Sequence, residues 1–141
     1  KAILAFLLKS FSDKHKIHVY NRSPICQDLI SGFPVEFLNL NSLKNSISDF
    51  DLIINATSLG SVTYPNETPI DKEALLKAKE KVILYDIIYN PPSTKLLKSA
   101  NQIGLKTING LRMNLVQAVL AFQYTNQTNL NQKKIYNIMS S

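Results

Sequence analysis

The chain has 141 residues, a net charge of +6 and an apolar fraction of 45%, which fit one globular domain with a modest core. Its lysines are scattered and form no stripe with interleaved aromatic residues, so the basic charge favours a solvated surface over a nucleic-acid face. The single cysteine, Cys26, excludes an internal disulfide, no Cys/His cluster has the spacing of metal ligands, and a reducing cytoplasm is the expected compartment.

The first element expected is a helix over residues 2–14, apolar on most sides and therefore largely buried. Its apolar run is far shorter than the ~20 residues of a membrane span. Short strands are expected at residues 16–20, 35–38, 51–56, 81–86 and 105–108. Further helices are expected to open at Pro24, at 42–48, near Asp71, and at 94–103, 111–124 and 130–139, with Ser93 and Gly104 as the caps of the helix 94–103.

Strands thus alternate with helices, and several strands are apolar over most of their length. This pattern is typical of an α/β protein with a parallel sheet that helices cover on both faces. In such sheets, ligands bind beyond the carboxyl ends of the strands.

Three segments resemble the shikimate dehydrogenases, in the order and at about the spacing of that family. They are DFDLIINATSLG at 49–60, YDIIYNPPSTKLL at 85–97 and TINGLRMNLVQAVLAF at 107–122. The resemblance implies a Rossmann-like fold, in which residues 1–141 form a partial NADP-binding domain with C-terminal helices. It also implies that the first strand, its glycine-rich phosphate loop and the N-terminal substrate domain lie outside this sequence, since nothing here matches them and residue 1 is Lys rather than Met.

The family reduces 3-dehydroshikimate to shikimate with NADP, a step of aromatic amino acid and chorismate biosynthesis. Its catalytic Lys–Asp pair belongs to the substrate domain, so the resemblance implies no catalytic residue in this chain and no activity for the chain alone. The implied partners are the small-molecule substrate and NADP, with neither nucleic acid nor membrane, and a homodimer of the intact enzyme stays open. Without the first strand, we expect the apolar strands DLIINA and VILYD to lack a neighbour.

Asn21, Arg22 and Ser23 follow the strand at 16–20, where NAD-binding Rossmann domains usually carry an acid for the ribose. No acid stands here, and a guanidinium can pair with a 2′-phosphate. The segment resembles the family's NRT-type motif, which implies a role in NADP binding, whereas a solvated turn arginine is the plainer interpretation. Ile25 and Cys26 occupy the region where many members carry a second basic residue.

Small polar residues end the strand at 51–56, in the segment NATSLG. Thr57, Ser58 and Gly60 would let backbone and hydroxyl groups approach a cofactor, as the family's NATxxG loop does. A strand-ending turn of the same composition is equally supported by the residues alone.

The segment after the strand at 81–86 places Ile87 and Tyr89 at the same edge of the sheet. By resemblance, Ile87 lies against the nicotinamide, where an apolar surface keeps water from the reacting carbon, and Tyr89 contacts the substrate. A tyrosine packed at the sheet edge is the alternative. Asp86 is interpreted as structural.

The segment NGLRMNLVQA opens the helix at 111–124. Gly110 permits close backbone approach, and the resemblance adds Met113 to the cofactor contacts and Gln117 as a hydrogen-bond partner of shikimate hydroxyls. Arg112 stands where the family normally has glycine, beside the nicotinamide end.

Two alternatives remain open from the sequence. One is a quinate/shikimate dehydrogenase that uses NAD, and the other is a non-catalytic nucleotide-binding remnant. Arg112 and Cys26 favour the remnant, while the intact NATSLG and YDIIYNPP segments and Gln117 favour a working enzyme.

Overall fold

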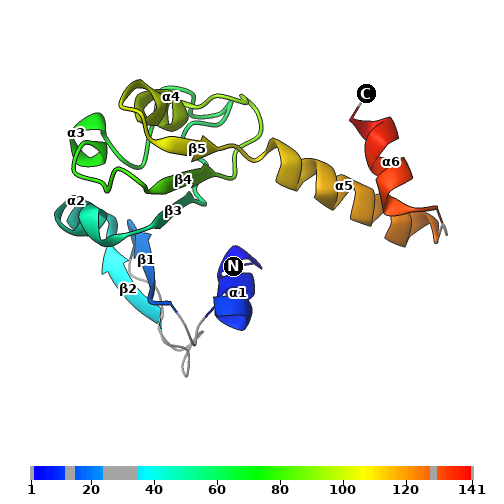
Figure 1. Ribbon diagram of the computed structural model, residues 1–141, viewed down its shortest axis with the longest axis horizontal. Helices are drawn as coiled ribbons and strands as arrows, with labels where there is room; N and C mark the ends of the chain where they lie inside the picture. Colours follow the sequence, from blue (N-terminus) through cyan, green and yellow to red (C-terminus); the bar gives the residue numbers. More distant parts are fainter. Residues whose placement is uncertain (1, 12–14, 24–34, 128–129, 141) are drawn as a thin grey trace. The chain divides into compact units, whose positions relative to one another are not determined.

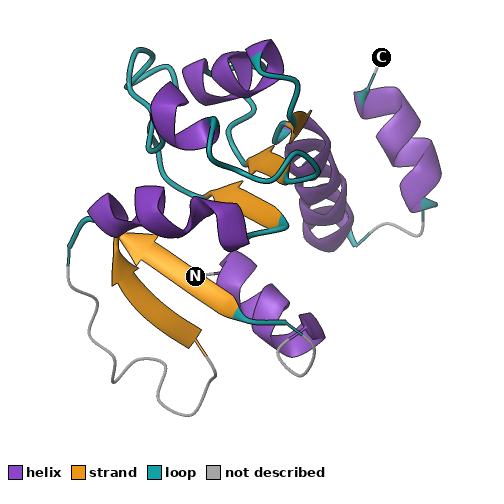
Figure 2. Cartoon of the chain, turned by 60° about the vertical axis from the view of Figure 1, so that its left-hand side comes forward, coloured by secondary structure: helices purple, strands orange, loops and turns teal. Residues whose placement is uncertain are grey.

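The computed structural model describes residues 2–11, 15–23, 35–127 and 130–140. These residues form two compact units, Lys1–Ser46 and Ile47–Ser141, and both contain helices and parallel strands (Figures 1 and 2). The helix expected to open at Pro24 lies outside the described residues.

The first unit contains α1 (Ala2–Phe11), β1 (Ile17–Asn21), β2 (Val35–Asn39), the 3-10 turn η2 (Leu40–Ser42) and α2 (Leu43–Ser46). Strands β1 and β2 are parallel and in register from Ile17 and Val35 to Asn21 and Asn39. Tyr20 Oη and Ser46 Oγ share a hydrogen bond of 2.6 Å, which joins the end of β1 to α2.

The expectation that the first helix is largely buried is wrong. Leu8 is the one buried residue of α1, and Phe6 is 62% exposed. The helix is apolar on several sides, whereas the described residues leave most of it exposed. The rings of Phe6 and Phe11 instead pack edge to face, with their centroids 6.2 Å apart.

The second unit contains the 3-10 turn η3 (Ile47–Asp49), β3 (Leu52–Asn55), α3 (Lys72–Leu75), β4 (Ile83–Asp86), α4 (Lys95–Gln102), β5 (Lys106–Ile108), α5 (Leu111–Asn126) and α6 (Gln132–Met139). Its three strands are parallel, in the order β3-β4-β5. The segment VILYD is therefore paired on both sides, contrary to expectation, because β5 lies against β4. The segment DLIINA is at the edge of this sheet, as expected.

The core of the second unit lies between the sheet and helices α3 and α4. Leu84 on β4 and Leu96 and Ala100 on α4 are fully buried, and Leu75 of α3 is 1% exposed. Leu96, Leu97 and Ala100 share one face of α4, the spacing of an amphipathic helix. Burying each leucine contributes about 1.5–3 kcal/mol, and this packing fixes α4 on the sheet.

Polar side chains cap the helices of this unit. Asp71 Oδ1 accepts a hydrogen bond of 2.7 Å from Ala74 N at the start of α3. Thr94, rather than the expected Ser93, caps α4, and its hydroxyl accepts from Leu97 N. The shift arises because the Thr94 hydroxyl also donates to a buried carboxylate. Gly104, with φ +81°, follows the C-cap of α4 as expected.

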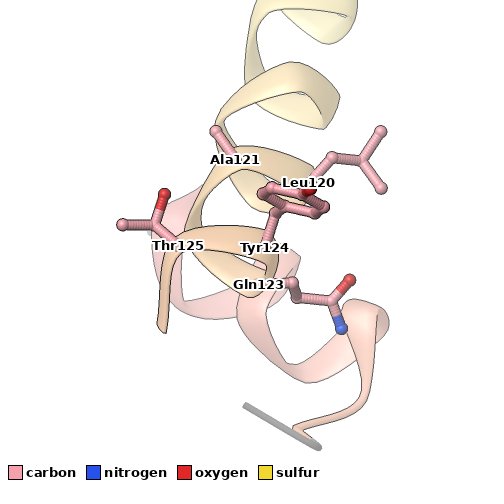
Figure 3. A pocket seen from close by; sticks show the side chains of 5 residues that line it. All are labelled: Leu120, Ala121, Gln123, Tyr124 and Thr125. Atoms are coloured by element: carbon pink, nitrogen blue, oxygen red, sulfur yellow. The ribbon is translucent and has the colours of Figure 1, made fainter. Parts of the chain in front are cut away.

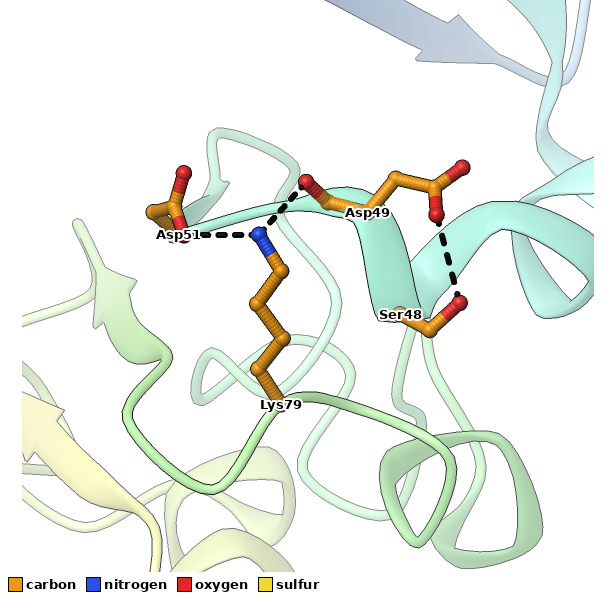
Figure 4. A network of polar contacts seen from close by, with 4 residues as sticks. All are labelled: Ser48, Asp49, Asp51 and Lys79. Atoms are coloured by element: carbon orange, nitrogen blue, oxygen red, sulfur yellow. Dashed lines mark hydrogen bonds and ion pairs between the residues drawn. The ribbon is translucent and has the colours of Figure 1, made fainter.

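An ion pair holds the amino end of β3. Lys79 Nζ lies 2.7 Å from Asp51 Oδ1 and donates to the Asp49 carbonyl at 3.0 Å, and the Ser48 hydroxyl contacts the Asp49 carboxylate (Figure 4). The Asp51 side chain is 88% exposed, so solvent screens the pair and its contribution is at most about 1 kcal/mol. Because this ion pair lies before β3, we assign it a structural role.

Helices α5 and α6 pack on each other, and each has one buried residue, Val119 in α5 and Ile135 in α6. Gln123 Nε2 donates to the Leu130 carbonyl at 2.7 Å and closes the turn between them. Leu120 and Tyr124 project beside a shallow pocket near the end of α5 (Figure 3). Within the described part of the chain, every helix is too short or too polar to cross a membrane.

Candidate functional site at the carboxyl edge of the sheet

The parallel register gathers three of the sequence segments at one edge of the β3-β4-β5 sheet. Asn55 pairs with Asp86, and Tyr85 with Ile108, at the carboxyl ends of neighbouring strands. The loops that follow these strands carry the predicted residues Thr57, Ser58, Ile87, Tyr89 and Gly110. The structure thus brings these residues to the edge where α/β sheets bind ligands.

A buried polar network underlies this edge. The Asp86 carboxylate is fully buried, and it accepts hydrogen bonds from Asn55 Nδ2 at 3.1 Å, Ile88 N at 3.1 Å and Thr94 Oγ1 at 2.7 Å. Asn55 and Thr94 are 3% and 1% exposed. These contacts give Asp86 the structural role expected of it, since a buried carboxylate is stable only with such partners. Asn55 and Thr94 were missed by the sequence interpretation, although a polar residue ending an apolar strand was a signal for Asn55.

The NATSLG loop is shaped by Asn55. Its Oδ1 accepts from both the backbone N and the hydroxyl of Thr57, at 3.0 and 2.8 Å, while the Thr57 hydroxyl accepts from Leu59 N. Gly60 is buried with φ +102°, and an added Cβ would lie 3.1 Å from Thr94 Cβ. The Thr57 hydroxyl is therefore engaged within the loop, and both Thr57 and Ser58 are exposed.

The Ile87–Ile88 backbone is held from two sides. Ile87 N donates to the Asn55 carbonyl at 3.1 Å, and Gly110 N donates to the Ile88 carbonyl at 3.0 Å. A Cβ on Gly110 would lie 1.9 Å from the Ile87 oxygen, so the close approach expected of Gly110 is confirmed. Ile87 is half-buried, and Tyr89 is 50% exposed at this edge.

The first turns of α5 carry the remaining predicted residues of this unit. Met113 is half-buried, whereas Arg112 and Gln117 are exposed. Among the described residues no side-chain hydrogen bond involves Gln117, which leaves its amide open to a ligand. Asn109 fixes the entry to the helix, because its Nδ2 donates to the Pro92 carbonyl at 3.0 Å and its Oδ1 accepts from Leu111 N.

Asn21, Arg22 and Ser23 lie in the first unit, and all three are exposed. Asn21, the last residue of β1, donates through Nδ2 to the Ser23 carbonyl at 3.1 Å. This bond shapes the turn and leaves the guanidinium of Arg22 in solvent. Ile25 and Cys26 lie outside the described residues.

Titratable groups add one observation. Burial raises the pKa of Tyr85, on the central strand β4, above its usual value of 10.0. Within residues 2–11, 15–23, 35–127 and 130–140, no group of three or more His, Cys, Asp or Glu side chains is placed to hold a metal ion.

Comparison with known proteins finds shikimate dehydrogenases among the curated relatives. No protein-family model matches the chain. A shikimate dehydrogenase (NADP(+)) of Methanococcus vannielii is 37% identical over 110 residues, which cover 75% of this chain and 38% of that protein. The chain therefore spans little more than a third of the length of this curated relative.

Solved structures of this kind share the fold. Shikimate dehydrogenase 1 from Peptoclostridium difficile is 27% identical, with a TM-score of 0.77 over 98% of this chain and 49% of that chain. A quinate dehydrogenase from Corynebacterium glutamicum, solved in complex with NAD, is 25% identical, with a TM-score of 0.62 over 79% of this chain and 38% of that chain. These similarities confirm the Rossmann-like α/β fold expected from the sequence.

Proposed function

Because the chain belongs to the shikimate dehydrogenase family and matches its C-terminal part, we propose that it forms the NADP-binding part of an enzyme that reduces 3-dehydroshikimate to shikimate. The observation that carries the proposal is the gathering of NATSLG, IIYNPP and Gly110 at the carboxyl edge of β3-β4-β5. When bound in its reduced form, NADPH would supply the hydride for the carbonyl reduction and would leave as NADP⁺. The proposal includes the cytoplasmic location and the homodimer of the intact enzyme.

The cofactor contacts are assigned by place and chemistry. Arg22, with Asn21 and Ser23 in the same turn, is exposed at the end of β1 and pairs with the 2′-phosphate. Thr57 and Ser58, which are exposed in the loop after β3, contact the cofactor in this proposal. A half-buried Ile87 provides an apolar surface for the nicotinamide, and Gly110 and Met113 complete that end of the site. Gly110 lets the loop after β5 pack against the Ile87 backbone, since an added Cβ would lie 1.9 Å from the Ile87 oxygen. The exposed Ser58 and the half-buried Ile87 remain accessible at this edge and fit a cofactor with one polar and one apolar contact.

The substrate contacts are Tyr89 and Gln117. Tyr89 follows β4 and is half exposed, and Gln117 is exposed one helical turn beyond Met113 on α5. Both side chains are free to hydrogen-bond the hydroxyl groups of a small polyol acid. The proton donor belongs to the Lys–Asp pair that the family resemblance places outside these residues, since the Lys79–Asp51 pair lies at the amino end of β3, away from this edge.

The test is a complementation assay. The 141-residue chain is assayed for shikimate-dependent NADP reduction, first alone and then mixed with the remaining part of the Methanococcus vannielii enzyme. We expect no turnover by the chain alone and turnover by the mixture. Turnover by the chain alone contradicts the assignment of proton transfer to other residues, and no turnover in a mixture that forms a folded complex favours the non-catalytic remnant.

The NAD-dependent quinate/shikimate alternative is favoured by the structural similarity to the quinate dehydrogenase. Against it stands the chemistry of the β1 turn, where Arg22 is present and a carboxylate is absent. The same complementation mixture decides between them when NADP is exchanged for NAD and shikimate for quinate.

A further inference from the structure

We propose that Asp86 is a positioning residue that locks the two cofactor-facing loops, residues 57–60 and 87–89, into one rigid edge. The inference rests on the proposed function, because it assigns a purpose to a buried carboxylate that the proposed reaction does not itself use. An ion pair does not explain why this carboxylate is buried, since among the described residues Asp86 pairs with no lysine, arginine or histidine.

The two carboxylate oxygens hold different parts of the site. Oδ1 accepts from Asn55 Nδ2 and from Ile88 N, both at 3.1 Å, and so ties the end of β3 to the segment after β4. Oδ2 accepts from Thr94 Oγ1 at 2.7 Å and ties that segment to the cap of α4. Every partner is a donor, so the network is satisfied by the ionised carboxylate.

Asn55 connects Asp86 to the first loop, residues 57–60. Its Nδ2 also donates to the Leu59 carbonyl at 3.3 Å, and its Oδ1 accepts the two hydrogen bonds from Thr57. Gly60 packs on the side chain of Thr94. The loop 57–60 is thus fastened at both ends to partners of Asp86.

Ile88 connects Asp86 to the second loop, residues 87–89. Its N is fixed by Asp86 Oδ1 and its carbonyl by Gly110 N, while Ile87 N is bonded to Asn55. The backbone from Asp86 to Ile88 is therefore held by hydrogen bonds on both sides, and this restricts where the Ile87 and Tyr89 side chains project. Loss of the network is expected to let the two loops move independently, which weakens cofactor binding in protein that is still folded.

Thr94 offers a matched pair of variants. Thr94→Ser keeps the hydroxyl that reaches Asp86, and Thr94→Val keeps the volume but removes the hydroxyl. Backbone amide NMR shifts of residues 57–60 and 87–89 are followed while NADP⁺ is added to the 141-residue chain mixed with the remaining part of the Methanococcus vannielii enzyme, at a temperature where circular dichroism shows each variant folded. Asp86→Asn is the second variant. It keeps the shape of the side chain but replaces one accepting oxygen with an NH₂ group, which cannot accept a hydrogen bond from the surrounding donors.

We expect Thr94→Ser to bind as the unaltered chain does, and Thr94→Val and Asp86→Asn to bind roughly tenfold more weakly, the order expected when a hydrogen bond to a charged group is lost. Amide shifts of the two loops should follow one binding curve in the unaltered chain. Equal affinity in all folded variants overturns the positioning role alone, because a merely structural network alters stability without altering the affinity of the folded chain. Absence of saturable shifts in the unaltered mixture overturns the proposed function and the positioning role together.

Discussion

Two glycines of this chain are needed for different physical reasons, and substitution by alanine separates them. Gly110 has φ −78°, a conformation open to any residue, but an added Cβ would lie 1.9 Å from the Ile87 oxygen and 2.4 Å from its carbonyl carbon. Gly104 has φ +81° and nothing within 4 Å of an added Cβ. The first position therefore lacks space, and the second lacks an allowed backbone conformation.

The magnitudes follow from these contacts. Alanine at Gly110 forces the Ile87–Ile88 segment away from α5, at an overpacking cost of about 1–3 kcal/mol. The shift also breaks the bond from Gly110 N to the Ile88 carbonyl, worth about 0.5–1.5 kcal/mol. We expect Gly110→Ala to lower the free energy of unfolding by about 2–4 kcal/mol. For Gly104→Ala, the left-handed conformation alone costs about 1 kcal/mol.

Urea unfolding followed by circular dichroism measures both variants, with the unaltered chain as reference and equal m-values as the condition for comparison. The reasoning is refuted if Gly110→Ala loses no more stability than Gly104→Ala. A loss at Gly110 that comes with an unchanged Ile88 amide shift would also refute it, because the steric cost is assigned to that contact.

Three further predictions concern the cofactor turn, the substrate and the sheet. In the complemented enzyme, Arg22→Ala should weaken NADP binding by about 1.5–3 kcal/mol while NAD binding is unchanged, with Lys9→Ala as the control for net charge; equal affinity for the two cofactors before mutation would contradict it. In the complemented enzyme, Gln117→Ala should lower kcat/KM for shikimate by a factor that corresponds to about 0.5–1.5 kcal/mol and leave NADP affinity unchanged. Wild-type shikimate kinetics in this variant would show that Gln117 does not contact the substrate. Because burial raises the pKa of Tyr85, the neutral phenol stabilises the fold below its usual pKa of about 10, and this stability is lost as pH rises through the higher folded value. Tyr85→Phe should therefore unfold less readily than the unaltered chain at alkaline pH, as urea titrations near pH 9 and about pH 11 would show, whereas Tyr124→Phe, at a residue 90% exposed, should not.

The sequence predicted the strands to within two residues, most clearly β3 and β4, which are short apolar runs that end in a polar residue. It predicted less well what depends on neighbours far along the chain. The burial of α1 was overestimated, because apolar composition says nothing of how wide a surface is available to cover a helix. The cap of α4 was placed on Ser93 since either hydroxyl suits that position, and the contact of Thr94 with Asp86, eight residues earlier, decides between them.

The network around Asp86 shows the same limit for the site. Asn55 and Asp86 are 31 residues apart, and only the register of β3 on β4 brings their side chains together. Spacing along the chain cannot reveal such a pair, although a polar residue closing each of two apolar strands was visible. By contrast, the close approach at Gly110 was predicted, because a glycine between a strand and a helix has few other reasons to be there.

The two ends of the β3-β4-β5 sheet carry polar groups of different kinds, and this difference bears on function. At the amino end, Lys79 and Asp51 form an ion pair that solvent screens, so either residue can change at little cost to stability. At the carboxyl end, Asn55, Asp86 and Thr94 are buried, and removing one partner leaves another polar group unsatisfied. Buried charged groups are weak evidence for stability, since well-packed apolar residues in their place are often no less stable. The polar network is therefore best explained by the loops that it holds in place at the edge where the cofactor is proposed to bind.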